Sequence, residues 1–194
     1  SVDFDGNVAL WDLERRSALA SVIGLPAANA GRVLTSDGTA VVTMHVDGSV
    51  DAVDVESGRR RWGPIAIADP ITPDPFVVPW RLAVSPDGRR LTVAEPDGPA
   101  QQWDTVTGRR VGGPIGGRGV AAVVGVAYSP DGSMLVTGSQ DGWLQRWDAA
   151  TGEALGPAVR PDTPEAAGYI EGAETFSETV EDPVFSPDGR LLAT

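Results

Sequence analysis

Short apolar stretches separated by turn residues run along the whole chain. In one stretch Trp143, Gln145 and Trp147 occupy alternate positions, so they lie on one face of an extended strand. No stretch has the periodicity of an amphipathic helix. The pattern therefore predicts an all-β chain. Further segments with strand composition are 39–46, 50–55, 81–85 and 134–139.

Tight turns recur between these strands in a fixed phase. An Asp-Gly pair begins at residues 5, 47, 97 and 141, so successive pairs are 42, 50 and 44 residues apart. Such intervals are expected for one blade of a β-propeller. Six residues after each Asp stands Trp or Val, and another Asp follows directly. The recurring positions are Asp5, Trp11 and Asp12; Asp47, Val53 and Asp54; Asp97, Trp103 and Asp104; and Asp141, Trp147 and Asp148.

A second set of turns stands ten residues before the first set in three repeats. In such a turn Pro fixes φ, Asp accepts hydrogen bonds from the nearby backbone, and Gly adopts positive φ. Two kinds of hairpin turn in constant phase predict four short antiparallel strands per period. The copies are Ser36-Asp37-Gly38, Ser85-Pro86-Asp87-Gly88, Ser129-Pro130-Asp131-Gly132 and Ser186-Pro187-Asp188-Gly189.

The combined motif resembles a known family. Residues 129–157, SPDGSMLVTGSQDGWLQRWDAATGEALGP, closely resemble a blade of a WD-repeat β-propeller, and residues 85–114 look like a second copy. The resemblance implies four strands, a to d, in each blade. It also implies that the Ser-Pro-Asp-Gly turn joins strand a to b, that the Asp-Gly turn joins b to c, and that Trp-Asp ends strand c.

The chain departs from the family pattern before strand a. WD-repeat blades commonly carry a Gly-His pair there, whose His joins a network with the turn Asp, a strand-b Ser or Thr and the Trp. No Gly-His pair occurs in this chain. We expect Ser139, Asp141 and Trp147 to form the rest of the network in their blade, and apolar contacts to hold the blades together. The single histidine, His45, is expected at the surface or rim and not as a catalytic base.

The phase of the motifs divides residues 1–194 into about four blade-equivalents of a single propeller segment. Both ends look cut, so we expect a piece of a larger protein and an open arc of a larger ring. Joining Thr194 to Ser1 gives the alternative, a closed four-bladed ring. The expected parts are a partial blade at 1–23, blades at 31–67, 79–115 and 120–159, a partial blade at 180–194, a proline-rich loop at 66–79 and an acidic insert at 160–183.

Composition removes most kinds of chemistry from consideration. The chain has no Cys, which excludes disulfides, thiolate catalysis and cysteine-ligated zinc. A single His leaves almost no room for a histidine metal site or a Ser–His triad. The net charge of −12 disfavours a phosphate backbone as partner, and no run of about 18 apolar residues predicts a membrane helix. We expect no catalytic residue, cofactor, metal, nucleic acid or membrane span in this segment.

Three local patterns have alternative interpretations. Asp3, Asp5 and Asn7 resemble the start of a calcium loop, but the later bidentate Glu is missing and a hairpin turn explains them. The Arg run at 59–61 suggests a phosphate-binding stripe, yet Arg at the start of strand d also protects an exposed sheet edge. The acidic insert at 160–183 either docks a basic partner or is a solvated loop.

Two classes of function follow. The resemblance implies a non-catalytic scaffold that binds a protein partner or another domain of its parent chain. We expect it to be the propeller arm of a larger bacterial signalling or regulatory protein in the cytoplasm. The alternative is an enzyme, because VDAVDVESGRRRW at residues 50–62 resembles a repeat of quinone-dependent dehydrogenases that ends in Trp62. The Cys, Lys and metal-ligand sets of those enzymes are missing. An open arc would expose apolar sheet faces, so we expect poor solubility or self-association.

Overall fold

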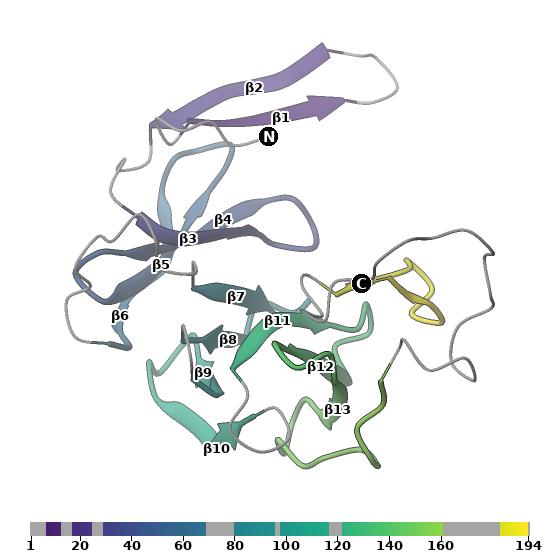
Figure 1. The fold of residues 1–194 in the computed structure, drawn as a ribbon. Helices are drawn as coiled ribbons and strands as arrows, with labels where there is room; N and C mark the ends of the chain where they lie inside the picture. The colour runs from purple at the N-terminus through teal and green to yellow at the C-terminus, as the bar shows by residue number, and fades with distance from the viewer. Residues whose placement is uncertain are drawn as a thin grey trace. The chain divides into compact units, whose positions relative to one another are not determined.

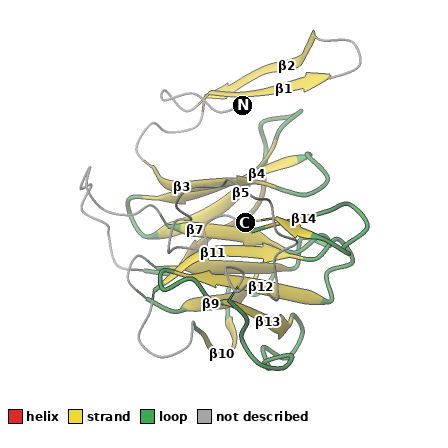
Figure 2. Cartoon of the chain, turned by 45° about the vertical axis from the view of Figure 1, so that its right-hand side comes forward, coloured by secondary structure: helices red, strands yellow, loops and turns green. Residues whose placement is uncertain are grey.

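The computed structural model describes the backbone of residues 7–12, 17–24, 29–68, 80–95, 98–116, 122–160 and 183–193, and the side chains of these residues from 31 onward. Within these ranges all regular secondary structure is β-strand (Figures 1 and 2). The prediction of an all-β chain is confirmed. The chain divides into two units, Ser1–Pro75 and Phe76–Thr194, which are described separately.

The described residues of unit 1 form two antiparallel sheets. The first is a hairpin of β1 and β2, and the second has four strands in the order β3-β4-β5-β6. Along β4 every residue from Ala40 to Met44 is buried, so apolar side chains fill both faces of this strand. The strands are β1 (Asn7–Asp12), β2 (Ser17–Gly24), β3 (Asn29–Leu34), β4 (Ala40–His45), β5 (Ser49–Asp54) and β6 (Arg60–Ala66).

In unit 2 the part that the structure describes forms three antiparallel sheets. Their strand orders are β10-β9-β8-β7, β11-β12-β13 and β14-β15. The first strands of the three sheets lie close to one another, with β11 between β7 and β14, as blades do around a propeller axis (Figure 1). The strands are β7 (Arg81–Val84), β8 (Arg90–Ala94), β9 (Ala100–Asp104), β10 (Arg110–Ile115), β11 (Val123–Tyr128), β12 (Met134–Ser139), β13 (Leu144–Asp148), β14 (Val184–Phe185) and β15 (Leu192–Ala193).

The blade expected at 120–159 has three regular strands and an irregular fourth segment. Leu144 and Val159 exchange two backbone hydrogen bonds of 2.8 Å, and the Leu155 N–H donates to the Arg146 carbonyl. Residues 156–158 therefore bulge out of the ladder. Pro157 lies in this bulge and has no N–H to donate, which explains why a regular strand d is interrupted there.

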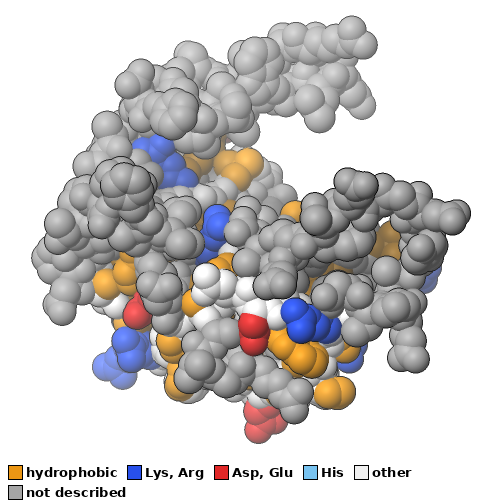
Figure 3. Space-filling view, in the orientation of Figure 1, with side chains coloured by type: hydrophobic (Ala, Val, Ile, Leu, Met, Phe, Trp, Pro, Cys, Tyr) orange, Lys and Arg blue, Asp and Glu red, His pale blue; other side chains and the backbone are white. Residues whose placement is uncertain are grey.

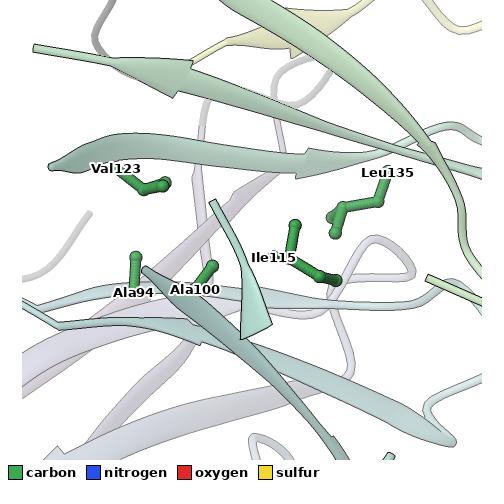
Figure 4. Close-up of a cluster of buried hydrophobic side chains, with 5 residues drawn as sticks. All are labelled: Ala94, Ala100, Ile115, Val123 and Leu135. Carbon is green, nitrogen blue, oxygen red and sulfur yellow. The ribbon is translucent and has the colours of Figure 1, made fainter. Parts of the chain in front are cut away.

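The junction between the sheets β7–β10 and β11–β13 is filled by apolar side chains. Each of the five residues at its centre is at most 2% exposed, so the two sheet faces are in close contact (Figure 4). Burial of this kind is the main source of stability between blades. The five residues are Ala94, Ala100, Ile115, Val123 and Leu135.

The opposite face of the sheet β11–β13 packs against the last sheet. Val136 and Leu144 are buried there, and Phe185 and Leu192 lie against them. The two faces of β12 therefore contact two different sheets. This arrangement follows from the alternation of side chains along a strand.

Both expected inserts fall largely outside the described residues. Of the proline-rich loop at 66–79 the structure describes 66–68, and of the acidic insert at 160–183 it describes the two end residues. The sites Asp5 and Asp97 also lie outside the described ranges.

Candidate functional site

The turns between strands a and b form the same polar network in four repeats. The Ser129 hydroxyl donates to Asp131 Oδ1 at 2.6 Å, and the Ser133 N–H donates to the same oxygen at 3.0 Å. The Met134 N–H donates to Ser129 Oγ at 2.9 Å, which closes the hairpin. The equivalent hydroxyl–carboxylate pairs are Thr35–Asp37, Ser85–Asp87 and Ser186–Asp188, so in the first repeat Thr35 and not Ser36 supplies the hydroxyl.

In unit 2 these turns stand side by side along one edge. A Cβ on Gly132 would lie 3.4 Å from Pro86 Cδ, and a Cβ on Gly189 would lie 3.4 Å from Pro130 Cδ. Each proline ring thus contacts the glycine of the next turn. The last two turns line a shallow hollow of about 400 Å³, with Met134 in its wall. In the space-filling view Arg and acidic side chains are interspersed with apolar ones on the described surface (Figure 3).

The Asp that follows the Trp or Val position shapes the turn into strand d. Asp148 Oδ1 accepts hydrogen bonds from the N–H groups of Ala150 and Thr151, at 3.0 and 2.8 Å, and from the Thr151 hydroxyl at 3.1 Å. These donors lower the pKa of the Asp148 carboxyl below its ordinary 3.8. Asp104 with Thr107, and Asp54 with Ser57, make the same contacts.

Hydrogen bonds to the turn aspartates predict a loss of stability in acid. The hydroxyls of Thr35 and Thr39 and the Thr39 N–H lower the pKa of Asp37 from 3.8 to about 2. The folded state therefore binds this proton less readily than the unfolded chain. The stabilisation is complete above the unfolded-state pKa and is lost as pH falls through the folded-state value. We expect the urea midpoint to decrease between pH 3.8 and about 2.

The matched control for this acid dependence is Asp37→Asn. The amide oxygen still accepts hydrogen bonds but does not titrate, so the midpoint should fall less steeply with pH. Equal slopes for the two proteins would contradict the assignment to Asp37.

The expected network of Ser139, Asp141 and Trp147 is divided into two contacts. Trp147 Nε1 donates to Thr137 Oγ1 at 2.9 Å, whereas Ser139 Oγ donates to Asp141 Oδ1 within the b–c turn. The strand-b partner of Trp147 is therefore Thr137. The register explains this difference: Trp147 pairs with Leu135, and Thr137 is the next residue on the same face.

The sheet β3–β6 lacks the equivalent contact. Val53 pairs with Val41 as Trp147 pairs with Leu135, so Val53 replaces the Trp and Thr43 corresponds to Thr137. Thr43 is 0% exposed, and its hydroxyl has no hydrogen-bond partner among the described residues. A buried hydroxyl without a partner costs free energy.

Two isosteric substitutions should therefore have different effects on stability. We expect Thr137→Val to lower the free energy of unfolding by about 1–2 kcal/mol, because it leaves the Trp147 N–H without its acceptor. We expect Thr43→Val to be neutral or to stabilise by up to about 1 kcal/mol, because it removes an unpaired hydroxyl. Urea unfolding of both variants checks the pair, and equal losses would contradict this explanation.

A cluster of ionisable side chains on β4, β5 and β6 was not anticipated. His45 Nε2 lies 2.9 Å from Asp51 Oδ1, and Arg60 Nε donates to Asp51 Oδ2 at 3.1 Å. Asp51 is 5% exposed, so its charge is paired inside the protein. The register brings these residues together, because Thr43 pairs with Asp51 and His45 follows on the same face. Both carboxylate oxygens are occupied, which gives the cluster the character of a structural ion pair.

His45 and Arg60 have contacts that the sequence did not predict. The His45 side chain is 18% exposed and lies beside Asp51, so it is a partly exposed residue with a structural partner. Arg60 was expected to protect the edge of strand d, but it also neutralises Asp51. The alternation of side chains along residues 43–51 was the available signal. It could not show that Asp51 would be buried.

The remaining repeat positions have structural contacts. Asp47 Oδ1 accepts hydrogen bonds from the N–H and hydroxyl of Ser49, and these donors lower the pKa of Asp47. Trp103 is 8% exposed, and the Arg110 guanidinium lies 5.1 Å from the centroid of its ring. Trp11 and Asp12 end β1, where their backbones pair with Ala18 and Ser17.

No metal site is found within the described part of the chain, where no three His, Cys, Asp or Glu side chains gather suitably. The Asp residues of the calcium-like pattern, Asp3 and Asp5, lie outside these ranges. None of the described residues forms a helix capable of crossing a membrane.

Stacked antiparallel sheets with adjoining first strands define the class of protein as a β-propeller. Residues 117–148 match the family described as WD domain, G-beta repeat. A search of the curated proteins finds no match. Residues 117–148 are therefore similar to a WD repeat, and the fold of the chain is that of a β-propeller.

Two solved structures illustrate the likeness. The β-propeller domain of Cps50 (Swd1) from Myceliophteria thermophila is 17% identical, with a TM-score of 0.64 over 98% of this chain and 55% of that one. The structure of U3-55K is 21% identical, with a TM-score of 0.52 over 69% of this chain and 39% of that one. The chain thus spans less than two thirds of either protein. At these identities the likeness shows the fold, and it confirms the β-propeller prediction.

Proposed function

We propose that this chain is a non-catalytic scaffold for protein–protein interaction, and the propeller arm of a larger bacterial signalling or regulatory protein in the cytoplasm. The observation that carries the proposal is the row of a–b turns at 85–88, 129–132 and 186–189, in which each turn packs against the next. Turns held by a rigid scaffold are where binding residues concentrate. WD-repeat propellers generally mediate interactions between proteins.

The charges along this row suit a protein partner, either a separate protein or another domain of the parent chain. Asp87, Asp131 and Asp188 alternate with the exposed Arg89 and Arg190, so neither sign of charge dominates. A phosphate backbone requires a continuous basic surface to overcome a net charge of −12. The mixed row therefore supports a protein partner and disfavours a nucleic acid.

The quinone-dependent alternative has a simpler structural explanation. The stretch at 50–62 covers β5, the c–d turn and the start of β6, and Trp62 is a half-buried strand-d residue paired with Ala52. Its Asp54–Ser57 turn has the same hydrogen bonds as the Asp104–Thr107 turn. The stretch is thus built like other WD-type turns, which supports the scaffold proposal.

The test uses single cysteines, because the chain has none of its own. A photo-crosslinker on Arg89→Cys or Arg190→Cys would sit in the turn row. The control Gln140→Cys places it in an exposed b–c turn at the other end of the strands. We expect a partner protein to crosslink from the first two positions and not from the third. It should also bind the purified, unlabelled chain and compete with the labelled one.

Two results would overturn the scaffold proposal. One is the absence of any partner that crosslinks specifically and binds the purified chain. The other is quinone-dependent dehydrogenase turnover by the chain itself.

The expected self-association stays a prediction. Val184 on β14 and Leu191 directly before β15 are 61% and 71% exposed, which supports this prediction.

A further inference from the structure

A buried polar network connects the first two sheets of unit 2. The Tyr128 hydroxyl on β11 lies 2.7 Å from Thr92 Oγ1 on β8 and accepts a hydrogen bond of 3.0 Å from Gln102 Nε2 on β9. Gln102 Nε2 also donates to the Ala149 carbonyl at 3.3 Å. Thr92 and Gln102 are 0% and 1% exposed. These four residues are called the Tyr128 network.

The side chains of this network come from two neighbouring sheets, and neither sheet's set is repeated elsewhere among the aligned repeats. The positions equivalent to Tyr128, directly before the a–b turn, hold side chains without a polar atom. The positions equivalent to Thr92 and Gln102 also hold other residues in the other repeats. No other pair of repeats can therefore form the same contacts. The equivalents are Leu34, Val84 and Phe185 for Tyr128, Val42, Val136 and Ala193 for Thr92, and Leu10, Ala52 and Arg146 for Gln102.

The next junction in unit 2 has apolar side chains in contact at the positions of Tyr128 and Thr92. Phe185 packs in the cluster with Val136, where Tyr128 bonds to Thr92 in the first junction. Apolar faces of similar repeats attract one another without direction, so they discriminate poorly between correct and incorrect partners. Buried polar groups discriminate well, because a partner without the matching atoms leaves them unpaired.

We propose that the Tyr128 network determines which sheet docks on the sheet β7–β10. A sheet that presents Leu34, Val84 or Phe185 in place of Tyr128 leaves the Thr92 hydroxyl and one Gln102 N–H without a partner. The correct sheet satisfies both. The network thus fixes the order of the blades during folding, and it does so independently of the proposed scaffold function. A buried polar set of this kind contributes specificity more than stability.

The first test examines the network in the unaltered protein. The chain has two tyrosines, Tyr128 and Tyr169. Burial raises the pKa of Tyr128 above its ordinary 10.0. In an alkaline absorbance titration one tyrosine should ionise late, and Tyr128→Phe should remove this late phase. If the late phase persists in Tyr128→Phe, the hydroxyl is not enclosed in solution and the proposal fails.

The second test separates specificity from stability. Tyr128→Phe alone should lower the melting temperature by about 2–8 °C, because it leaves buried polar groups unpaired. The triple variant Thr92→Val, Gln102→Leu, Tyr128→Phe contains no unpaired group, so its melting temperature should recover. Its amide NMR spectrum should then show more than one set of peaks for the strands of unit 2, because incorrect docking is no longer penalised.

The outcomes of the triple variant are decisive. A single set of peaks with wild-type amide exchange would overturn the proposal. Failure to fold would also overturn it, since the network would then supply stability and not specificity. The control Phe185→Tyr adds a hydroxyl at the apolar junction. It should lower the melting temperature without increasing the number of peak sets.

Discussion

Replacement of Gly63 by Ala is expected to lower the free energy of unfolding by about 2–5 kcal/mol. Gly63 has φ of +88°, a left-handed conformation that costs an L-residue about 1–2 kcal/mol. A Cβ there would also lie 2.7 Å from the Val50 carbonyl oxygen and 2.8 Å from Asp51 Cα and Cβ. Overpacking against such neighbours adds about 1–3 kcal/mol. The clash is with backbone, so rotation of a side chain cannot relieve it.

Two further glycines separate the sources of this cost. Gly88 has φ of +70° with no atom within 4 Å of an added Cβ, so Gly88→Ala should cost only about 1–2 kcal/mol. Gly113, on the equivalent strand β10, has neither a positive φ nor a neighbour within 4 Å. Gly113→Ala should change stability by no more than about 0.5 kcal/mol. Urea unfolding of the three variants should give this order. A loss for Gly63→Ala no greater than that for Gly88→Ala would contradict the proposed clash with Asp51.

Leu135→Ala is expected to cost about 2–5 kcal/mol, because Leu135 is 0% exposed at the centre of the junction between two sheets. The cavity would border Ile115, which lies on the other sheet and pairs with Ala100 of β9 (Figure 4). We therefore expect amide exchange to accelerate on both β9 and β12. Loss of protection on β12 alone would show that the junction does not couple the sheets.

Leu191→Ala is the matched control for this core substitution. In the last repeat Leu192 is the equivalent of Leu135, and Leu191 stands directly before it. The Leu191 side chain is 71% exposed. In the dissociated chain, the same deletion of apolar atoms should change the free energy of unfolding by no more than about 0.5 kcal/mol. A large loss at both positions would mean that Leu191 is covered in solution.

Much of the fold could be predicted because its signals are local. Ser129, Asp131 and Gly132 fix a hairpin through contacts within six residues, and the motif returns in the same phase. The alternation in residues 143–148 then predicts which side chains share a face. The irregular strand after Asp148 was not foreseen, because the bulge at residues 156–158 leaves no strong trace in the pattern.

The candidate site was less predictable because its contacts depend on burial and register. Trp147 was assigned to a network with Ser139, yet it bonds to Thr137, two residues away. Asp51 looked like an ordinary polar strand residue, but it is enclosed with His45 and Arg60. Such choices require knowledge of which side chains face one another across two strands.

The sequence by itself determined the all-β class, the repeat length, the turn residues and the absence of cysteine chemistry. Each of these properties depends on residues close together in the chain or on composition alone. Only the tertiary structure decided that Tyr128 bonds to Thr92 and Gln102, which are 36 and 26 residues away. It also decided that Gly63 faces the backbone of Asp51. The physical reason is that sheet packing and register place distant residues in contact, and neither is encoded at any single position.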